Sequence, residues 1–104
     1  FEELYTEAAE HIDDLAERLL AIQGSPVGTM KECLEMSAIK EADGSESAEQ
    51  MVQNIYNDFW TVAEELKSGM ELADEVNDET TGDMLLAIHQ SIEKHNWMLK
   101  AYLG

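Results

Sequence analysis

The sequence is poor in residues that cross-link or interrupt a chain. Its single cysteine, Cys33, cannot form an internal disulfide and stands in no metal-type cysteine spacing, which favours a reducing, intracellular compartment. With one proline and 44 % apolar residues, the chain of 104 residues is expected to fold as one largely helical domain. No apolar run is long enough to span a membrane, and no basic-then-apolar leader occurs. The sequence therefore predicts a cytoplasmic protein without a membrane partner.

Positive charge is also scarce. Six Lys and Arg residues stand against 23 Asp and Glu residues, which gives a formal net charge of −17 at pH 7. Such a surface repels phosphate groups, so it disfavours nucleic acids and anionic membranes as partners. Cations are the favoured partners, although most of the carboxylates must simply coat the surface.

Apolar residues recur at spacings of three and four, which predicts three long amphipathic helices at about 1–23, 47–76 and 79–102. A short helix is expected at about 30–37, in the crossover between the first two. No strand pattern competes, so the predicted fold class is all-α. The apolar stripes comprise Leu4, Ala8, Ile12, Leu15, Leu19 and Ile22, then Val52, Ile55, Phe59, Val62, Leu66, Ala73 and Val76, then Leu85, Ile88, Ile92, His95, Leu99 and Tyr102.

Local signals mark the ends of these helices. Capping-box patterns begin at Thr29 and Ser47. Residues 42–45 are expected to form a loop, and residues 77–80 a tight turn. Gly69 interrupts the second long helix, which predicts a kink or a close packing contact at that position.

The order of the helices points to a particular architecture. The tight turn makes the last two long helices antiparallel neighbours, whereas the first is joined to them by a crossover of about 23 residues. A ferritin-like four-helix bundle has such a crossover, but one of its helices is not in this sequence. Because Phe1 is not a methionine and the helical pattern already runs there, we expect preceding residues to supply the first bundle helix.

Three carboxylates, Glu2, Asp13 and Glu17, lie close to the edge of the first apolar stripe. Asp13 and Glu17 are four residues apart and project from the same helix face, within reach of one ion. Glu2 shares this face but lies roughly 16 Å away along the helix axis. One chain cannot bring all three to one metal, whereas two antiparallel copies that cross near Ala8 and Ala9 could. On these residues alone, an ordinary solvated acidic surface is the simpler interpretation.

Other chemistry has less support. The Glu-x-x-His motif of a di-iron site within one subunit is absent, because apolar residues stand three positions before His11, His89 and His95. No phosphate-binding glycine loop, HExxH motif or serine elbow occurs, which disfavours a kinase, protease or hydrolase. His95 is expected to be a structural core histidine and His89 an exposed one. We interpret as packing residues Met70, Met84, Met98, Trp97 and Tyr102.

Two segments closely resemble the Dps family of bacterial mini-ferritins. They are FEELYTEAAEHIDDLAERLLAIQGSPVGTMKECLEMSAIKEA and GDMLLAIHQSIEKHNWMLKAYLG, with the linked motifs D-x-x-A-E-R, G-x-P-x-x-T and K-H-x-W-M. The resemblance covers essentially the whole chain. It implies a four-helix bundle with a short helix in its crossover, twelve copies of which form a hollow shell. It also implies a ferroxidase that oxidises ferrous iron, typically with hydrogen peroxide, oxygen being the other oxidant, and stores the ferric mineral inside.

The resemblance assigns roles to the three carboxylates. Family ferroxidase centres lie between two subunits related by a two-fold axis, with two histidines and an acidic residue from one chain and an Asp and a Glu from the other. Glu2 corresponds to the first acidic residue, where family members often have aspartate, and Asp13 and Glu17 correspond to the partner positions. The two family histidines would lie upstream of Phe1.

The resemblance also points to an iron-entry pore. Three acidic residues around the last tight turn match the lining of the family's three-fold pores. They are Asp74, Glu79 and Asp83. A ring of carboxylates would concentrate divalent cations, whereas the simpler interpretation is an acidic turn that caps a helix. Both interpretations are open, and Asp83 is the leading pore candidate.

Two other functions compete with iron oxidation. Some family members coat DNA in the nucleoid, usually through flexible lysine-rich termini, and none is present in these residues. DNA binding is therefore not expected of this surface. The second competing function is that of an acidic helical interaction module without chemistry.

Overall fold

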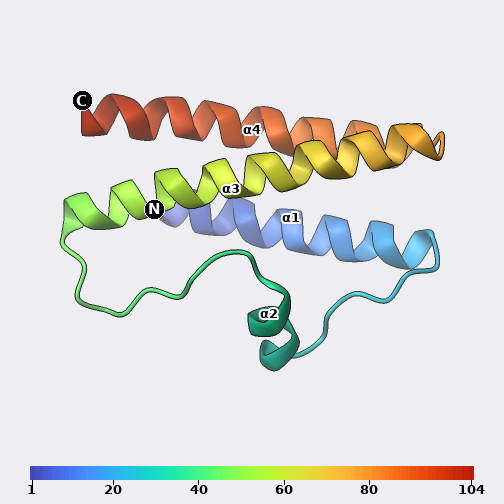
Figure 1. Cartoon of the computed structure of the whole chain (residues 1–104), viewed down its shortest axis with the longest axis horizontal. Helices are drawn as coiled ribbons and strands as arrows, with labels where there is room; N and C mark the ends of the chain where they lie inside the picture. The colour runs from blue at the N-terminus through green and yellow to red at the C-terminus, as the bar shows by residue number, and fades with distance from the viewer. The chain divides into compact units, whose positions relative to one another are not determined.

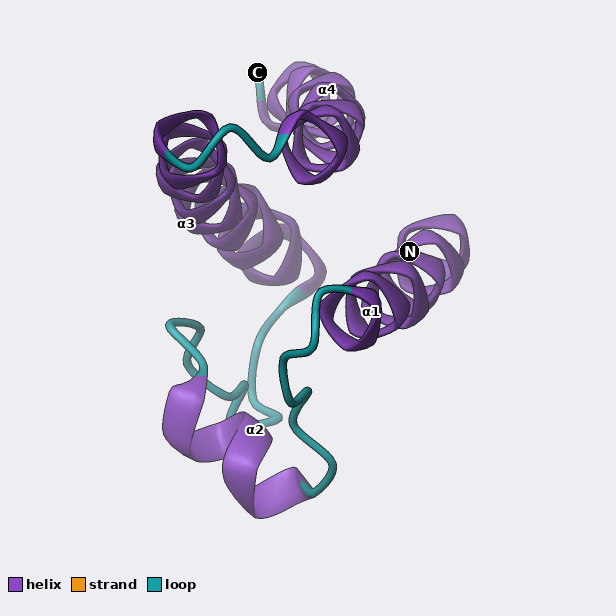
Figure 2. Cartoon of the chain, turned by 90° about the vertical axis from the view of Figure 1, so that its right-hand side faces the viewer, coloured by secondary structure: helices purple, strands orange, loops and turns teal.

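The computed structural model describes all 104 residues, as four helices joined by loops and without a strand (Figure 1 and Figure 2). Every helix end lies within two residues of the bound predicted from the sequence, and the all-α class is confirmed. The chain divides into two compact units, Phe1–Ser37 and Ala38–Gly104, which are described separately below. The helices are α1 (Glu2–Ala21), α2 (Met30–Met36), α3 (Ala48–Glu75) and α4 (Glu79–Leu103).

A tight turn joins α3 and α4 into the antiparallel hairpin that the sequence predicts (Figure 1). Asn77 takes a positive φ of 60°, which asparagine tolerates better than most residues. Its N–H donates to the Asp74 carbonyl at 3.1 Å, and the Asp78 N–H donates to the Ala73 carbonyl at 2.8 Å. These two bonds form a Schellman motif, which ends α3 cleanly. Asp78 then caps α4 by accepting a hydrogen bond from the Thr81 N–H at 3.1 Å.

Buried side chains on the facing sides of α3 and α4 form the core of the second unit. Gly69 allows the two helices to approach closely, because an added Cβ there would lie 2.9 Å from Leu85 Cδ1. Since α3 is continuous through this residue, a close packing contact is the alternative that the structure bears out. The buried apolar residues are Val52, Ala63, Leu66, Ala73, Ile88 and Ile92.

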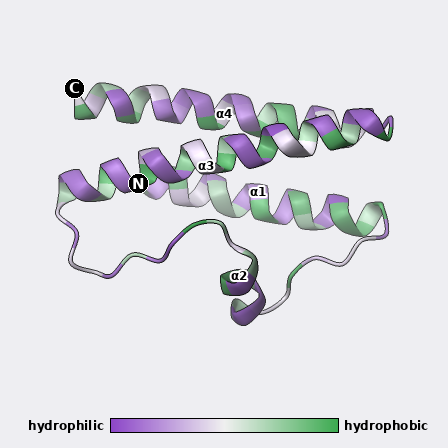
Figure 3. Cartoon of the chain, in the orientation of Figure 1, coloured by the Kyte–Doolittle hydropathy of each residue, from purple (hydrophilic) through white to green (hydrophobic).

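The hydropathy pattern gives the core positions with some errors. Hydrophobic and hydrophilic residues alternate along the helices (Figure 3), as expected of amphipathic segments. Ala63 is buried although the predicted stripe omits it, and Val76 and Tyr102, which the stripes include, are 66 % and 67 % exposed. Trp97, which we interpreted as a packing residue, is also exposed. The three exposed residues lie at the ends or on the outer sides of the hairpin, where the other helix does not cover them.

In the first unit, no residue of α1 or α2 is buried. The helix α2 begins at the predicted cap, where the Thr29 hydroxyl accepts a hydrogen bond from the Glu32 N–H at 3.1 Å. The Glu32 carboxylate accepts a hydrogen bond from the Gly28 N–H at 3.3 Å. In a full capping box it would accept from the Thr29 N–H instead. The second predicted box, at Ser47 and Gln50, is present with both of its hydrogen bonds.

The end of α1 suggests a stabilising substitution. Gln23 takes a φ of 69° in a second Schellman motif, in which its N–H donates to the Leu20 carbonyl at 3.0 Å. Positive φ costs a non-glycine residue about 1–2 kcal/mol. Glycine avoids this cost, but it loses more conformational entropy on folding, which offsets part of the gain. We expect Gln23→Gly to stabilise the protein by about 0.5–1 kcal/mol, read as a higher midpoint in urea denaturation. Asn77→Gly, at the matching position after α3, should gain less, and a lower midpoint for Gln23→Gly would contradict the argument.

Candidate metal centre

The three carboxylates predicted to bind iron all lie on α1, and all are exposed. Asp13 and Glu17 are one helical turn apart, while Glu2 is about 16 Å from Asp13 along the axis. No group of three or more His, Cys, Asp or Glu residues in the chain could hold a metal ion. The structure therefore brings together Asp13 and Glu17 but places Glu2 away from them.

These carboxylates share one side of α1. With about 100° of rotation per residue, Glu2, Asp13 and Glu17 point within about 60° of one another. The small or apolar residues Ala9 and Leu20 lie on the same side, and Leu20 is exposed. None of the three carboxylates makes a hydrogen bond or ion pair within the chain, so their oxygens are free to accept a cation.

None of the three histidines joins this group. On α1, His11 points to the other side of the helix, where its Nε2 lies 3.4 Å from Glu7 Oε2 without the alignment of a hydrogen bond. The expectation that His89 is exposed is wrong: 13 % of its side chain is exposed, and its Nδ1 lies 3.3 Å from Glu93 Oε1. His95 is buried with its ring 6.3 Å from that of Phe59, as expected of a structural histidine.

Asn96 is a buried polar residue that the sequence analysis did not single out. Its Nδ2 donates to the Tyr56 carbonyl at 3.3 Å and so links α4 to α3, whereas its Oδ1 has no partner. The Tyr56 ring in turn makes an edge-to-face contact with Trp60, with ring centroids 6.5 Å apart. Asn96 is four residues after Ile92, so helical periodicity alone could have placed it in the core.

The carboxylates assigned to a pore surround the turn between α3 and α4. Asp74 lies near the end of α3, and Glu79 and Asp83 lie in the first turns of α4. All three are exposed and make no hydrogen bond or ion pair within the chain. Asp78 supplies the hydrogen-bonding cap of α4. Glu79 lies in the first turn of α4, where a negative charge stabilises the helix, so the capping interpretation stays open for Glu79.

Two other carboxyls have shifted pKa values, and neither belongs to a predicted site. In the predicted loop 42–45, the Ser45 hydroxyl donates to Asp43 Oδ1 at 2.5 Å and, together with the Ser45 N–H, lowers the pKa of Asp43. Partial burial on α3 raises the pKa of Asp58. Local hydrogen bonding and desolvation, not a metal site, account for these shifts.

None of the four helices combines the length and the hydropathy of a membrane-spanning segment. Comparison with known protein families matches residues 1–104 to the ferritin-like domain. General stress protein 20U of Bacillus subtilis is 74 % identical over 104 residues, which are all of this chain and 72 % of that protein. DNA protection during starvation protein 2 of Bacillus anthracis is 57 % identical over 104 residues, 71 % of its length.

Solved structures agree with these sequence matches. A crystal structure of Dps from Staphylococcus aureus superposes with a TM-score of 0.97 at 48 % identity, over all of this chain and 70 % of that one. A Dps protein from Bacillus brevis gives a TM-score of 0.98 at 56 % identity, over all of this chain and 70 % of that one. The chain therefore belongs to the ferritin-like family and, within it, to the Dps proteins.

Proposed function

We propose that this protein oxidises ferrous iron at sites shared between two subunits and stores the ferric product inside a hollow cytoplasmic shell of twelve subunits. Hydrogen peroxide is the proposed oxidant. The observation that carries the proposal is the placement of Glu2, Asp13 and Glu17 on one side of α1, in a chain of the Dps family. These carboxylates can meet only between two copies of the helix.

The geometry of the shared site follows from the positions along α1. If two copies run antiparallel and cross near residues 8 and 9, Glu2 of one copy lies opposite the turn that holds Asp13 and Glu17 of the other. Ala9, on the same side of α1 as the three carboxylates, is exposed and small, so the two helices can approach closely there. A two-fold axis at the crossing would create two equivalent sites about 20 Å apart along the helices.

The ligand chemistry suits ferrous iron as the substrate. Carboxylate oxygens and neutral imidazole bind Fe(II) well, and open coordination positions leave room for the oxidant. Glu17 is the proposed principal ligand, and Asp13 is the second contact. The other subunit would contribute Glu2 and the two histidines expected upstream of Phe1. When two ferrous ions each give one electron to the same peroxide and two protons are taken up from the solvent, the O–O bond breaks and two water molecules form. No hydroxyl radical is released. A Listeria innocua Dps that is 44 % identical was solved after soaking with zinc, another divalent cation.

Light scattering and iron oxidation together test the proposal. The protein, expressed with whatever sequence precedes Phe1 in its gene, should run as a shell of twelve subunits and oxidise ferrous iron when peroxide is added without oxygen. A stable monomer that oxidises iron would contradict the shared site. A shell that neither binds nor oxidises iron would leave the acidic interaction module as the better description.

We propose that Asp74, Glu79 and Asp83 guide iron into the shell by electrostatic attraction. Asp83→Asn should slow iron uptake by about two- to fivefold at low ionic strength and less at high salt, because ions screen the field of the wild-type carboxylates. Initial rates of iron uptake across a salt series would measure this. Glu49→Gln removes the same charge at the other end of α3 and should leave the rates unchanged. Equal rates for Asp83→Asn and wild type at every salt concentration would refute the pore assignment.

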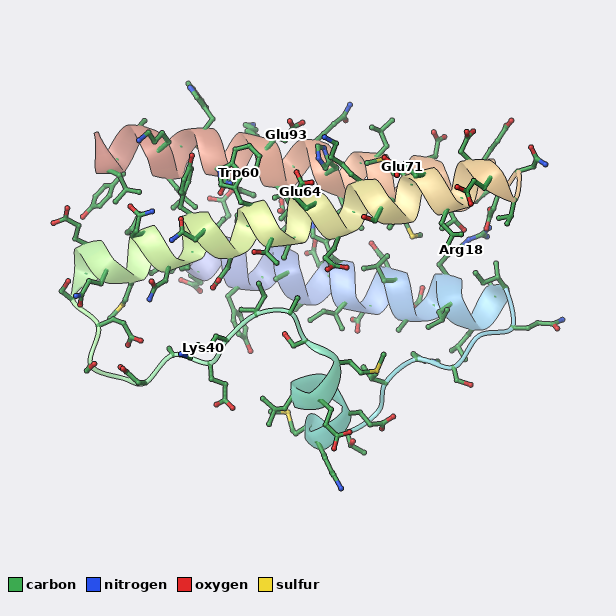
Figure 4. The ribbon with its side chains drawn as sticks, in the orientation of Figure 1. Arg18, Lys40, Trp60, Glu64, Glu71 and Glu93 are labelled. Atoms are coloured by element: carbon green, nitrogen blue, oxygen red, sulfur yellow. The ribbon has the colours of Figure 1, made fainter.

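DNA coating is the alternative function suggested by the printed names of several relatives. The positive residues give it no basic cluster along the sequence, because no two of the six are closer than six positions. Arg18 and Lys40 are two of them (Figure 4). Acidic residues such as Glu64 and Glu71 follow α3 in the same view. We therefore propose iron handling, and not DNA binding, as the activity of these residues.

A further inference from the structure

The helix α1 is apolar over a wider arc than one packing contact needs. With about 100° of rotation per residue, all side chains within an arc of about 140° are apolar, whereas the apolar stripe of a surface helix is about 100° wide. Leu4 and Leu15, at one edge of this arc, are half-buried in the single chain. Tyr5 and Ile12, toward the other edge, are 78 % and 68 % exposed and are the most exposed large apolar residues of α1. In order around the helix, the arc comprises Leu4, Leu15, Ala8, Leu19, Ile12, Tyr5, Ala16 and Ala9.

The proposed pairing of two α1 helices determines which residues of the second copy lie opposite these side chains. When antiparallel helices cross between residues 8 and 9, the numbers of two opposite residues add up to about 17. Glu2 then lies opposite the turn that holds the two carboxylates of the other copy. In the same register, Tyr5 of one copy lies opposite Ile12 of the other.

The two-fold axis also determines which sides of the helices meet. It is perpendicular to the plane of the two helices, so each side of one helix meets the same side of the other. Ala9 points toward the partner, with the three carboxylates about 20–80° to one side of it. Tyr5 and Ile12 lie about 40–60° to the other side. The crossing that brings the carboxylates together therefore also brings Tyr5 of one copy to Ile12 of the other.

We infer that Tyr5 of each subunit packs against Ile12 of a second copy of this chain, in an apolar contact beside the shared iron site. The inference rests on the proposed function for the antiparallel crossing of α1. The contact occurs twice in each pair, about 5 Å from the two-fold axis along the helices, whereas the carboxylates lie about 10 Å from it. Burial of an aromatic ring against an aliphatic side chain favours association. The contact thus holds the two helices at the separation that the site requires.

Disulfide cross-linking of the assembled, full-length protein tests the inference. In a Cys33→Ser background, Tyr5→Cys combined with Ile12→Cys should convert most subunits to covalent dimers on oxidation, as seen on a non-reducing gel. Either substitution alone should give no dimer, because the two copies of one position lie about 10 Å apart along the helices, and a disulfide spans at most about 7 Å between Cα atoms. The same limit excludes a disulfide between positions 5 and 12 of one chain. If the double variant forms no more dimer than the single variants, the inference is wrong.

Glu3→Cys combined with Asp14→Cys is the matched control, in the same Cys33→Ser background. Both residues are exposed on α1, and their numbers also add up to 17, so they share the register of the proposed contact. They point about 180° away from Tyr5 and Ile12 around the helix, so they should not cross-link. Equal dimer yields from the two double variants would indicate random collisions and would overturn the inference.

Iron oxidation by the wild-type shell separates this inference from the proposed function. Specific cross-links between positions 5 and 12, in a protein whose wild-type shell oxidises no iron, would support the contact and contradict the ferroxidase proposal. Iron oxidation at sites shared between subunits, without these cross-links, would support the proposed function and overturn the contact.

Discussion

Replacing Glu17 with Gln is expected to lower peroxide-dependent iron oxidation by at least about 10- to 100-fold, because even the loss of a residue that only supports a metal ligand typically costs that much. Glutamine keeps the size and polarity of the side chain but removes the negative charge that binds the cation. Glu17 is exposed and makes no hydrogen bond or ion pair within the chain, so folding and shell assembly should persist. Stopped-flow absorbance of ferric product after peroxide addition gives the rate, and light scattering confirms the assembly.

Glu49→Gln is the matched control for this variant. Glu49 is also an exposed glutamate, but it lies in the first turn of α3 and not on the side of α1 that holds the three carboxylates. Its substitution removes the same charge and should change the rate by less than about twofold. Equal losses in the two variants would show that general acidity, and not a site at Glu17, supports iron oxidation.

The local parts of the fold could be predicted because their signals are local. Ser47 and Gln50 stand three residues apart and make both bonds of a capping box, and Asn77 takes the positive φ that ends α3. The spacing of Ile88 and Ile92 predicted their burial, since residues four apart share one helix face. Such features depend on neighbours within one or two turns of the chain.

Features that depend on contacts between elements were harder to predict. Tyr102 continues the apolar stripe of α4, but α3 does not cover it, so it is exposed. His89 looked like an exposed residue, yet most of its side chain is covered and it pairs with Glu93. Periodicity gives the direction of a side chain and not the length or position of the helix that packs against it.

The candidate metal centre was predictable only in part, for a related reason. Helical geometry placed Glu2, Asp13 and Glu17 on one side of α1 and showed that a single chain cannot bring them together. The same geometry allowed two antiparallel copies to bring them together. Their roles in an iron site, and the two histidines, came from the resemblance to the Dps family. The membership is confirmed by the comparisons, whereas the site stays a prediction.

Mixed shells provide the second large expected effect. Glu2→Ala and Glu17→Gln subunits should each form shells with little iron oxidation, because every site in either shell carries one lesion. In a mixed pair, one site carries both lesions, while the other combines the intact Glu2 of one subunit with the intact Glu17 of its partner. Random assembly from equal amounts makes half of the pairs mixed, so about a quarter of all sites should be intact.

The rate of peroxide-dependent iron oxidation by co-assembled Glu2→Ala and Glu17→Gln subunits therefore tests the intersubunit site most directly. Native mass spectrometry would first establish that both subunits are present in the same shells. The shared site predicts about a quarter of the wild-type rate, well above that of either variant alone. Mixed shells no more active than the average of the two parent variants would contradict it.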